Sequence, residues 1–379
     1  MRRKIFVGLS LWLLAFSAPT LFNCPGALAQ GVNPLPNHLL GQDRCQTVED
    51  NGANGGGFIV PNGLIQQALN ALGSYSDTCN SSEQTSTTSP SIAEIKSWRF
   101  RSNLPFPCTN VEGTECNGKF YVIGGFGNNL KSSADVEEYN PATDTWTTKA
   151  SMPTPRYDLA VASYDGLIYA VGGYSGPGIW HNTLEVYNPK TDTWLKKAPM
   201  PTVRDNLKAG IINGKLYAIG GNNQTNDYLT SNEEYDISTD KWTVKAPMPT
   251  GRNALDLTVV NNILYVVGGM QETGFSNANE AYDPSTDKWE TKASLPTPRR
   301  HLGVTSLNNK IYAIGGYNST GDLAVNEVYN VQADSWSLAP AINEKRNRFA
   351  IATVNSHIFI AGGWSNNSWF LDSVEESMP

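Results

Sequence analysis

Short runs of apolar and aromatic residues, each ended by turn residues, recur from residue 93 to the end of the chain. One unit reads DLAVASYDG, LIYAVGG, NTLEVYN and DTWLKKA within residues 158–198. These runs are rich in β-branched and aromatic residues and lie between Gly, Pro, Asn and Asp, a pattern that predicts four short strands. Helical periodicity occurs only over Asn62–Tyr75. The sequence therefore predicts an all-β fold for residues 93–379.

The unit recurs at a nearly constant period. Gly-Gly doublets follow one another at spacings of 48, 48, 48, 47 and 47 residues, and five units place a Trp seven residues after a Tyr. A fixed period of this length indicates a repeat architecture. The repeat landmarks are Gly124-Gly125, Gly172-Gly173, Gly220-Gly221, Gly268-Gly269, Gly315-Gly316 and Gly362-Gly363, with Trp146, Trp194, Trp242, Trp289 and Trp336.

These landmarks resemble those of the Kelch family, in which a Gly-Gly doublet after an apolar strand precedes a Tyr and a Trp at a fixed offset and an Arg before the next unit. The resemblance covers about three-quarters of the chain, residues 93–379. It implies a six-bladed Kelch-type β-propeller, in which four-stranded blades surround a central channel.

The two ends of the repeat region complement each other. The last unit stops after three strands, whereas Trp98 lies 26 residues before Gly124, the same offset that separates Trp146 from Gly172. We therefore expect the strand that carries Trp98 to complete the last blade. This closure would cover two sheet edges that would otherwise be exposed.

The first blade departs from the pattern, because its first strand is replaced by the polar segment CTNVEGTECNG. A regular strand would separate Cys108 from Cys116 by about 26 Å, too far for a disulfide. Two alternatives stay open: the segment loops out and the pairs are Cys45–Cys79 and Cys108–Cys116, which we prefer, or the blade cysteines pair with Cys45 and Cys79.

Residues 1–29 have the layout of a secretory signal, with Arg2, Arg3 and Lys4 before an apolar run and Ala27-Leu28-Ala29 at the expected cleavage site. Export and cleavage predict a secreted or periplasmic chain with no membrane insertion afterwards. Loss of the three cations changes the formal charge from −7 to −10. An acidic chain without a basic tract is not expected to bind nucleic acid. We interpret residues 30–92 as a partly ordered extension and expect a monomer.

Strand direction predicts that the loop before each first strand and the loop after each second strand meet at one mouth of the channel, the default binding site of such a scaffold. An Arg lies 16 residues before five of the doublets, at Arg156, Arg204, Arg252, Arg299 and Arg346, with Cys108 in the sixth place. Because a residue that recurs with the scaffold usually serves the scaffold, we assign the Arg set a structural role.

The loop positions that vary between copies are better ligand candidates. Resemblance to Kelch domains that bind partners implies that this rim makes the contacts, and its aromatic, amide and acid groups suit a glycan or a protein. The predicted ligand-binding residues are Tyr157, Asp158, Tyr174, Asp205, Asn206, Arg300, His301, Tyr317, Arg348 and Trp364, with Phe126, Trp180, His181 and Trp369 on the same rim.

The leading hypothesis from the sequence is a non-catalytic binding module. The chain also resembles exported six-bladed Kelch sugar mutarotases, in which an acid/base pair and a carboxylate-binding group would suffice. In that alternative the three roles fall to Asp158, His301 and Arg348. The four His residues are not at metal-ligand spacing, so we expect no metal and no cofactor.

Overall fold

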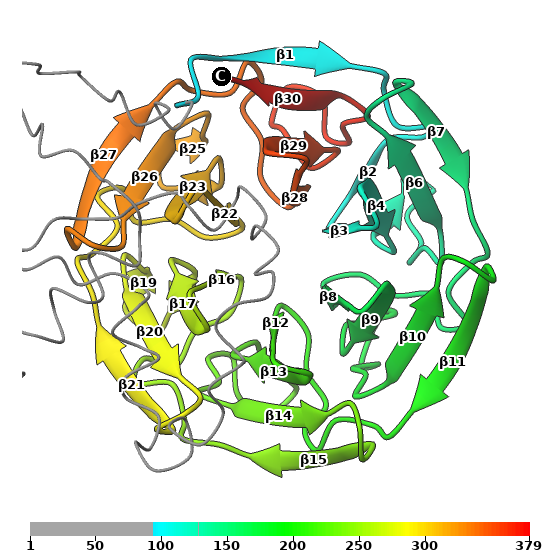
Figure 1. Cartoon of the computed structure of the whole chain (residues 1–379), viewed down its shortest axis with the longest axis vertical. Helices are drawn as coiled ribbons and strands as arrows, with labels where there is room; N and C mark the ends of the chain where they lie inside the picture. Colours follow the sequence, from blue (N-terminus) through cyan, green and yellow to red (C-terminus); the bar gives the residue numbers. More distant parts are fainter. Residues whose placement is uncertain (1–93, 128) are drawn as a thin grey trace, which may run out of the picture. The chain divides into compact units, whose positions relative to one another are not determined.

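The computed structural model describes residues 94–127 and 129–379. Within this part of the chain, six four-stranded antiparallel sheets are arranged radially around a channel (Figure 1). The structure therefore confirms an all-β, six-bladed propeller. No helix in the described residues is long and apolar enough to cross a membrane. The Cys45–Cys79 pair, the stretch of helical periodicity at Asn62–Tyr75 and the secretory signal lie outside the described residues.

Each blade runs outward from a strand that lines the channel. The inner strands are β3 (Glu112–Cys116), β8 (Ala160–Tyr164), β12 (Lys208–Ile212), β16 (Asp256–Val260), β22 (Gly303–Leu307) and β28 (Ala350–Val354). The second strands are β4 (Lys119–Ile123), β9 (Leu167–Val171), β13 (Lys215–Ile219), β17 (Ile263–Val267), β23 (Lys310–Ile314) and β29 (His357–Ala361). The second strands end at the Gly-Gly doublets and are the most deeply buried, since both faces pack against neighbouring blades.

The third and fourth strands complete the blades. The third strands are β6 (Val136–Asn140), β10 (Leu184–Asn188), β14 (Asn232–Asp236), β20 (Asn279–Asp283), β26 (Asn326–Asn330) and β30 (Val374–Met378). The outer strands are β7 (Thr145–Thr148), β11 (Thr193–Lys197), β15 (Lys241–Val244), β21 (Lys288–Thr291), β27 (Ser335–Ala339) and β1 (Ser97–Arg101). Short ladders on the loops pair β2 (Cys108–Thr109) with β5 (Phe126–Gly127), β18 (Met270–Gln271) with β19 (Gly274–Phe275), and β24 (Tyr317–Asn318) with β25 (Gly321–Asp322).

The sixth blade contains strands from both ends of the propeller, in the order β1-β30-β29-β28. Trp98 of β1 pairs with Ser377 of β30, and its indole N–H donates to Pro340 O at 3.0 Å. The same bond recurs in every other blade, where a Trp Nε1 donates to the carbonyl that follows the preceding blade's outer strand, as in Trp242 to Ala198 O at 2.8 Å. The N-terminal strand thus occupies the place that the position of Trp98 predicts.

The Gly-Gly doublets join neighbouring blades. The second Gly of each doublet donates its N–H to the carbonyl of the Arg, or of Cys108, in the next blade, at 2.8–3.0 Å. The first Gly has φ between 57° and 68°, and a Cβ added to Gly172 would lie 2.8 Å from Arg204 O. Only a residue without a side chain fits this close approach at a positive φ.

The recurring Arg residues have the structural role assigned to them. All five are fully buried, and each guanidinium pairs with a Glu on the third strand of its own blade. Arg156, for example, donates to Glu185 at 2.7 Å and to Gly172 O at 2.6 Å. These side chains therefore tie the loop before the inner strand to the end of the second strand.

The preferred disulfide Cys108–Cys116 is wrong. The polar segment forms the regular strand β3, with Cys116 at its end, whereas Cys108 begins β2. Both thiols are buried and free. The polar residues of β3 are compatible with burial because they have partners: Glu112 pairs with Lys208, and Glu115 accepts from Gly118 N at 2.7 Å. Gly113 allows close packing, since a Cβ there would lie 2.7 Å from Ile351 N.

Candidate ligand-binding face

The six loops that precede the inner strands meet around the channel in a closed ring of backbone hydrogen bonds. In each loop the residue two places after the Arg or Cys108 has φ between 48° and 55°. Its N–H donates to the carbonyl of its counterpart in the neighbouring blade at 2.8–3.3 Å. Asn, Asp and His tolerate this left-handed conformation better than most residues do. The ring consists of Asn110, Asp158, Asn206, Ala254, His301 and Arg348.

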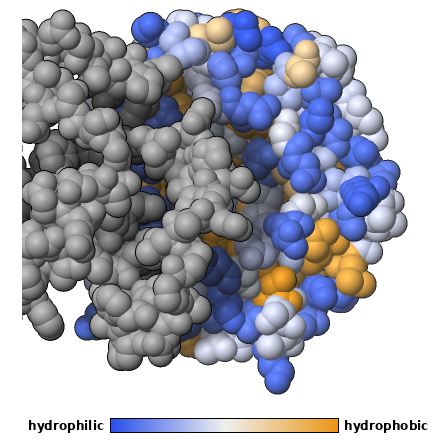
Figure 2. All heavy atoms as spheres, viewed as in Figure 1, coloured by the Kyte–Doolittle hydropathy of each residue, from blue (hydrophilic) through white to orange (hydrophobic). Residues whose placement is uncertain are grey.

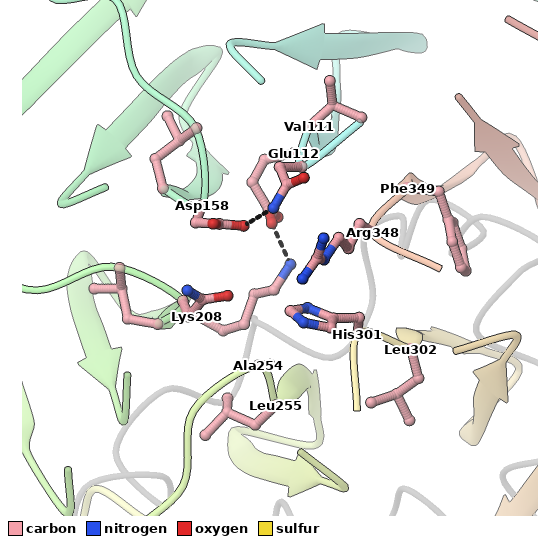
Figure 3. Close-up of a pocket in the computed structure, with 14 residues that line it drawn as sticks. Val111, Glu112, Asp158, Lys208, Ala254, Leu255, His301, Leu302, Arg348 and Phe349 are labelled. Atoms are coloured by element: carbon pink, nitrogen blue, oxygen red, sulfur yellow. Dashed lines mark hydrogen bonds and ion pairs between the residues drawn. The ribbon is translucent and has the colours of Figure 1, made fainter. Parts of the chain in front are cut away.

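The side chains of this ring converge on a cavity of about 30 Å³ together with Glu112 and Lys208 (Figure 3). Such a volume holds at most a few water molecules. Pockets that enclose a small-molecule ligand are roughly ten times larger. A sugar or a peptide side chain therefore cannot enter this cavity unless the lining side chains move.

Charged residues from distant parts of the chain meet in the cavity. Lys208, at the start of β12, donates to Glu112, at the start of β3, and lies 3.7 Å from Asp256 of β16. Asp256 also accepts from the backbone N–H groups of Leu257 at 2.8 Å and Val304 at 2.7 Å. Figure 3 shows Arg348 directed toward the same centre. Opposite charges from blades 1, 3 and 4 thus pair beside the channel.

Burial and neighbouring charges shift the pKa values in this cluster. Burial raises the pKa of Glu112, of Asp158 and of Asp256, although nearby cations oppose the shift. Burial lowers the pKa of Lys208, but Asp256 and Glu112 outweigh it and the net pKa is raised. The pKa of His301 is well below its usual value because of burial and the cations Arg348, Arg300 and Lys208. His301 is therefore a neutral imidazole at physiological pH.

Outside the ring, seven aromatic side chains form a continuous series on the loops of blades 2, 1 and 6, which we call the aromatic arc. Neighbouring ring centroids are 5.1–6.4 Å apart. These separations are typical of edge-to-face and offset contacts. The arc consists, in spatial order, of Trp180, Tyr174, Tyr157, Phe126, Phe370, Trp364 and Trp369. Trp369, at one end, is 64% exposed.

Polar groups flank the arc. Asp205 is buried beside Trp180, and burial together with Asp158 raises the pKa of Asp205 to about 7. One Asp205 oxygen and the Trp180 indole N–H have no hydrogen-bond partner in the described structure. Across the mouth, Arg300 lies 5.8 Å above the ring of Phe275 and 5.6 Å above that of Tyr317. The face therefore has acidic groups on blades 2 and 3 and basic groups on blades 5 and 6.

The structure divides the predicted site residues into separate groups. It brings Asp158, Asn206, His301 and Arg348 into the cavity. It places Tyr157, Tyr174 and Trp364 in the aromatic arc, Asp205 at the edge of the arc, and Arg300 and Tyr317 on the opposite side. Bridges such as Tyr157–Tyr174 and Asn347–Trp364 join the two predicted loops in each blade, so these loops lie on one face, called the loop face below.

Sequence reasoning missed four residues: Glu112, Lys208, Asp256 and Phe370. The first three occupy one repeat position, where the other blades have Ala160, Gly303 and Ala350. A charged residue at a channel-facing strand position that holds a small residue in the other blades could have indicated these three residues. No comparable signal marks Phe370, which reaches the arc through the fold of its loop. The described residues contain no group of three or more His, Cys, Asp or Glu that could hold a metal ion.

Comparison with known proteins agrees with this geometry. A family model described as the Attractin/LZTR1 beta-propeller matches residues 120–369. The chain belongs to this family of Kelch-type propellers. Among solved structures, the one titled "Structure of YjhT" aligns with a TM-score of 0.63 and 19% sequence identity, covering 73% of this chain and 96% of that one. This likeness reflects the shared fold. None of the curated proteins matches the chain.

Proposed function

We propose that this chain is an exported, non-catalytic binding module that holds a protein or glycan ligand across the loop face of the propeller. The observation that carries the proposal is the aromatic arc, which offers seven rings across three blades. Trp, Tyr and Arg are the residue types that dominate the binding energy of interfaces. The small volume of the cavity favours a ligand that lies on the face rather than inside the channel.

The proposal is tested by binding measurements on the chain beginning at Gln30, with a glycan array and with a panel of extracellular and envelope proteins. We expect Tyr174→Ala and Trp364→Ala to weaken binding by about tenfold or more, since hot-spot truncations typically have effects of this size. Leu338→Ala, on the exposed outer strand of blade 5, is the matched control and should bind like the parent. Parent-like binding by both aromatic variants would exclude the loop face as the site.

Mutarotation of a sugar acid is the second candidate, because Asp158, His301 and Arg348 share the cavity. Asp158 would act as the acid/base group, neutral His301 would exchange a proton with the sugar hydroxyl, and Arg348 would bind the carboxylate. A monosaccharide would have to displace the side chains around Lys208, so we place this candidate second.

Anomer-exchange NMR separates the two candidates. Enhanced exchange with a sialic acid or another monosaccharide, lost in Asp158→Asn and His301→Gln but kept in Trp364→Ala, would establish catalysis in the cavity. If every sugar that binds exchanges its anomers only at the spontaneous rate, catalysis is excluded and the binding module remains the proposed function.

A further inference from the structure

A second cavity, of about 310 Å³, lies on the side of blade 2 that faces blade 3. None of its lining residues belongs to the cavity or the aromatic arc of the loop face. Its walls are mainly apolar, and its size is at the lower end of the range for small-molecule sites. The apolar lining residues are Leu167, Tyr169, Val186, Leu195, Tyr235 and Ile237.

The cavity lies at a junction that lacks a ring contact found between other blades. At three other junctions a second-strand Tyr packs against a third-strand Tyr, with ring centroids 6.3, 5.7 and 6.0 Å apart for Tyr121–Tyr187, Tyr217–Tyr282 and Tyr265–Tyr329. In the described structure, Tyr169 and Tyr235 form no such contact. Both residues line the cavity, and both are buried in the same apolar cluster.

The apolar wall is a local departure from the repeat. Leu195 is 59% exposed and stands where the other blades have Thr147, Thr243, Glu290, Ser337 and Arg99. A leucine at an exposed position that is polar in every other copy has no role in the common scaffold. Differences of this kind between copies are where function on a repeat fold is expected.

One end of the groove is positively charged. Thr193, Leu195 and Lys197 line the cavity from alternate positions of β11, so they lie on one face of that strand and span about 13 Å. Lys197 is half-buried and makes no ion pair with any described residue, although its charge helps to lower the pKa of the nearby Asp240 carboxyl. An apolar groove that runs toward an ammonium group complements an extended apolar molecule with an anionic end.

We propose that this groove binds a linear aliphatic carboxylate. The carboxylate pairs with Lys197, and the hydrocarbon chain lies along Leu195, Val186 and Leu167 between blades 2 and 3. The site is independent of the loop face, so it stands or falls separately from the proposed function.

Isothermal titration of the chain beginning at Gln30 with decanoate, below its micellar concentration, tests the proposal. We expect one saturable site. Leu195→Glu, which introduces the residue found at position 290 in blade 4, should weaken binding at least tenfold, and the milder Leu195→Thr should weaken it several-fold. The matched control is Leu338→Glu, because Leu338 is 78% exposed on β27 and does not line the groove; binding should be unchanged. Thermal unfolding midpoints verify that each variant folds.

The charged end is tested by neutralising two adjacent lysines of β11. Lys197→Gln should weaken decanoate binding about tenfold, whereas Lys196→Gln, on the opposite face of the strand, should not change it. Decanol should bind the parent more weakly than decanoate does. Decanol should also bind Lys197→Gln as well as it binds the parent. Absence of a saturable site, unchanged affinity in Leu195→Glu, or equal effects of the two lysine substitutions would overturn the proposal.

Discussion

Blade 1 and the other five blades carry the same backbone but hold it together differently. In blades 2–6 a buried Arg pairs with a Glu of the third strand, whereas blade 1 retains the Glu, as Glu137, and replaces the Arg by Cys108. Phe106 also replaces the Thr that donates to this Glu in blades 2–5. Glu137 is left with the hydroxyl of Thr148, 3.0 Å from both carboxyl oxygens.

The backbone bond between blades survives this replacement. Gly363 N–H still donates to Cys108 O at 2.8 Å, just as the other doublets bond to their Arg carbonyls. The interblade bond therefore needs only the position of the residue before the inner strand. The Arg–Glu ion pair is a separate contact within a single blade. The propeller closes although blade 1 lacks this ion pair.

The largest contrast is expected between removing the Arg of an Arg–Glu ion pair and removing the Glu of blade 1 that has no Arg partner. Arg204→Met should lower the free energy of unfolding by about 3–5 kcal/mol, because it leaves the Glu233 carboxylate buried without its cation. Glu137→Gln should change it by less than about 1 kcal/mol, since no cation faces Glu137. Denaturant titration of both variants measures the contrast, and Arg204→Met with Glu233→Gln should recover most of the loss. Equal effects of the two single substitutions would contradict the distinction between the blades.

The closing blade should respond like an ordinary one. Trp98→Phe and Trp242→Phe each remove an indole N–H that donates to a carbonyl, so each should cost about 1–2 kcal/mol. Chemical unfolding followed by tyrosine fluorescence and circular dichroism compares them. A negligible cost for Trp98→Phe beside a clear cost for Trp242→Phe would show that β1 is not held as the other outer strands are.

A smaller effect is expected from pH. Burial raises the pKa of Glu137 above its usual 4.5, and Asp135 adds to the shift, while Thr148 opposes it. The folded chain therefore holds this proton more tightly than the unfolded chain does. The resulting stabilisation is fully present below pH 4.5 and is lost as the pH rises through the folded pKa.

Glu137→Gln should remove this dependence, so its stability relative to the parent should rise as the pH is raised from 4 to 8. Unfolding midpoints of both chains across that range provide the measurement. Parallel pH profiles would show that Glu137 does not titrate differently in the folded state.

The smallest perturbation is chemical labelling, which leaves the stability unchanged. Burial raises the pKa of the Cys108 thiol to about 12 and that of Cys116 to about 11, so neither forms a thiolate at neutral pH. Both should resist alkylation in the native protein and react after unfolding without a reductant. Mass spectrometric mapping checks this, and recovery of either cysteine in a disulfide would contradict the free thiols.

Most of the fold could be predicted from the repeat. Gly-Gly doublets, Trp residues and Arg residues at fixed offsets are read from the sequence because each serves the same local contact in every blade. The partial copies at the two ends of the repeat region indicate which strand completes the sixth blade. The polar strand of blade 1 misled the prediction of the cysteines, because its Glu112 is satisfied by a lysine 96 residues away.

The candidate site could be predicted from the sequence only in part. Residues such as Asp158, His301 and Arg348 could be placed on one face, because their loops recur in register with the strands. Their contacts depend on the diameter of the channel and on side chains that cross it. The arc includes Phe370 because the loop after β29 folds back toward Phe126, with ring centroids 6.4 Å apart, which the repeat does not encode.

Local periodicity, then, determined the strands, the number of blades and the face on which the variable loops lie, since these depend on contacts that each copy makes in the same way. Ring closure decided which charges meet beside the channel, which aromatic rings touch and where a gap opens between blades 2 and 3. Those features join residues one or more whole repeats apart, and their distances are set by how the blades pack rather than by spacing along the chain.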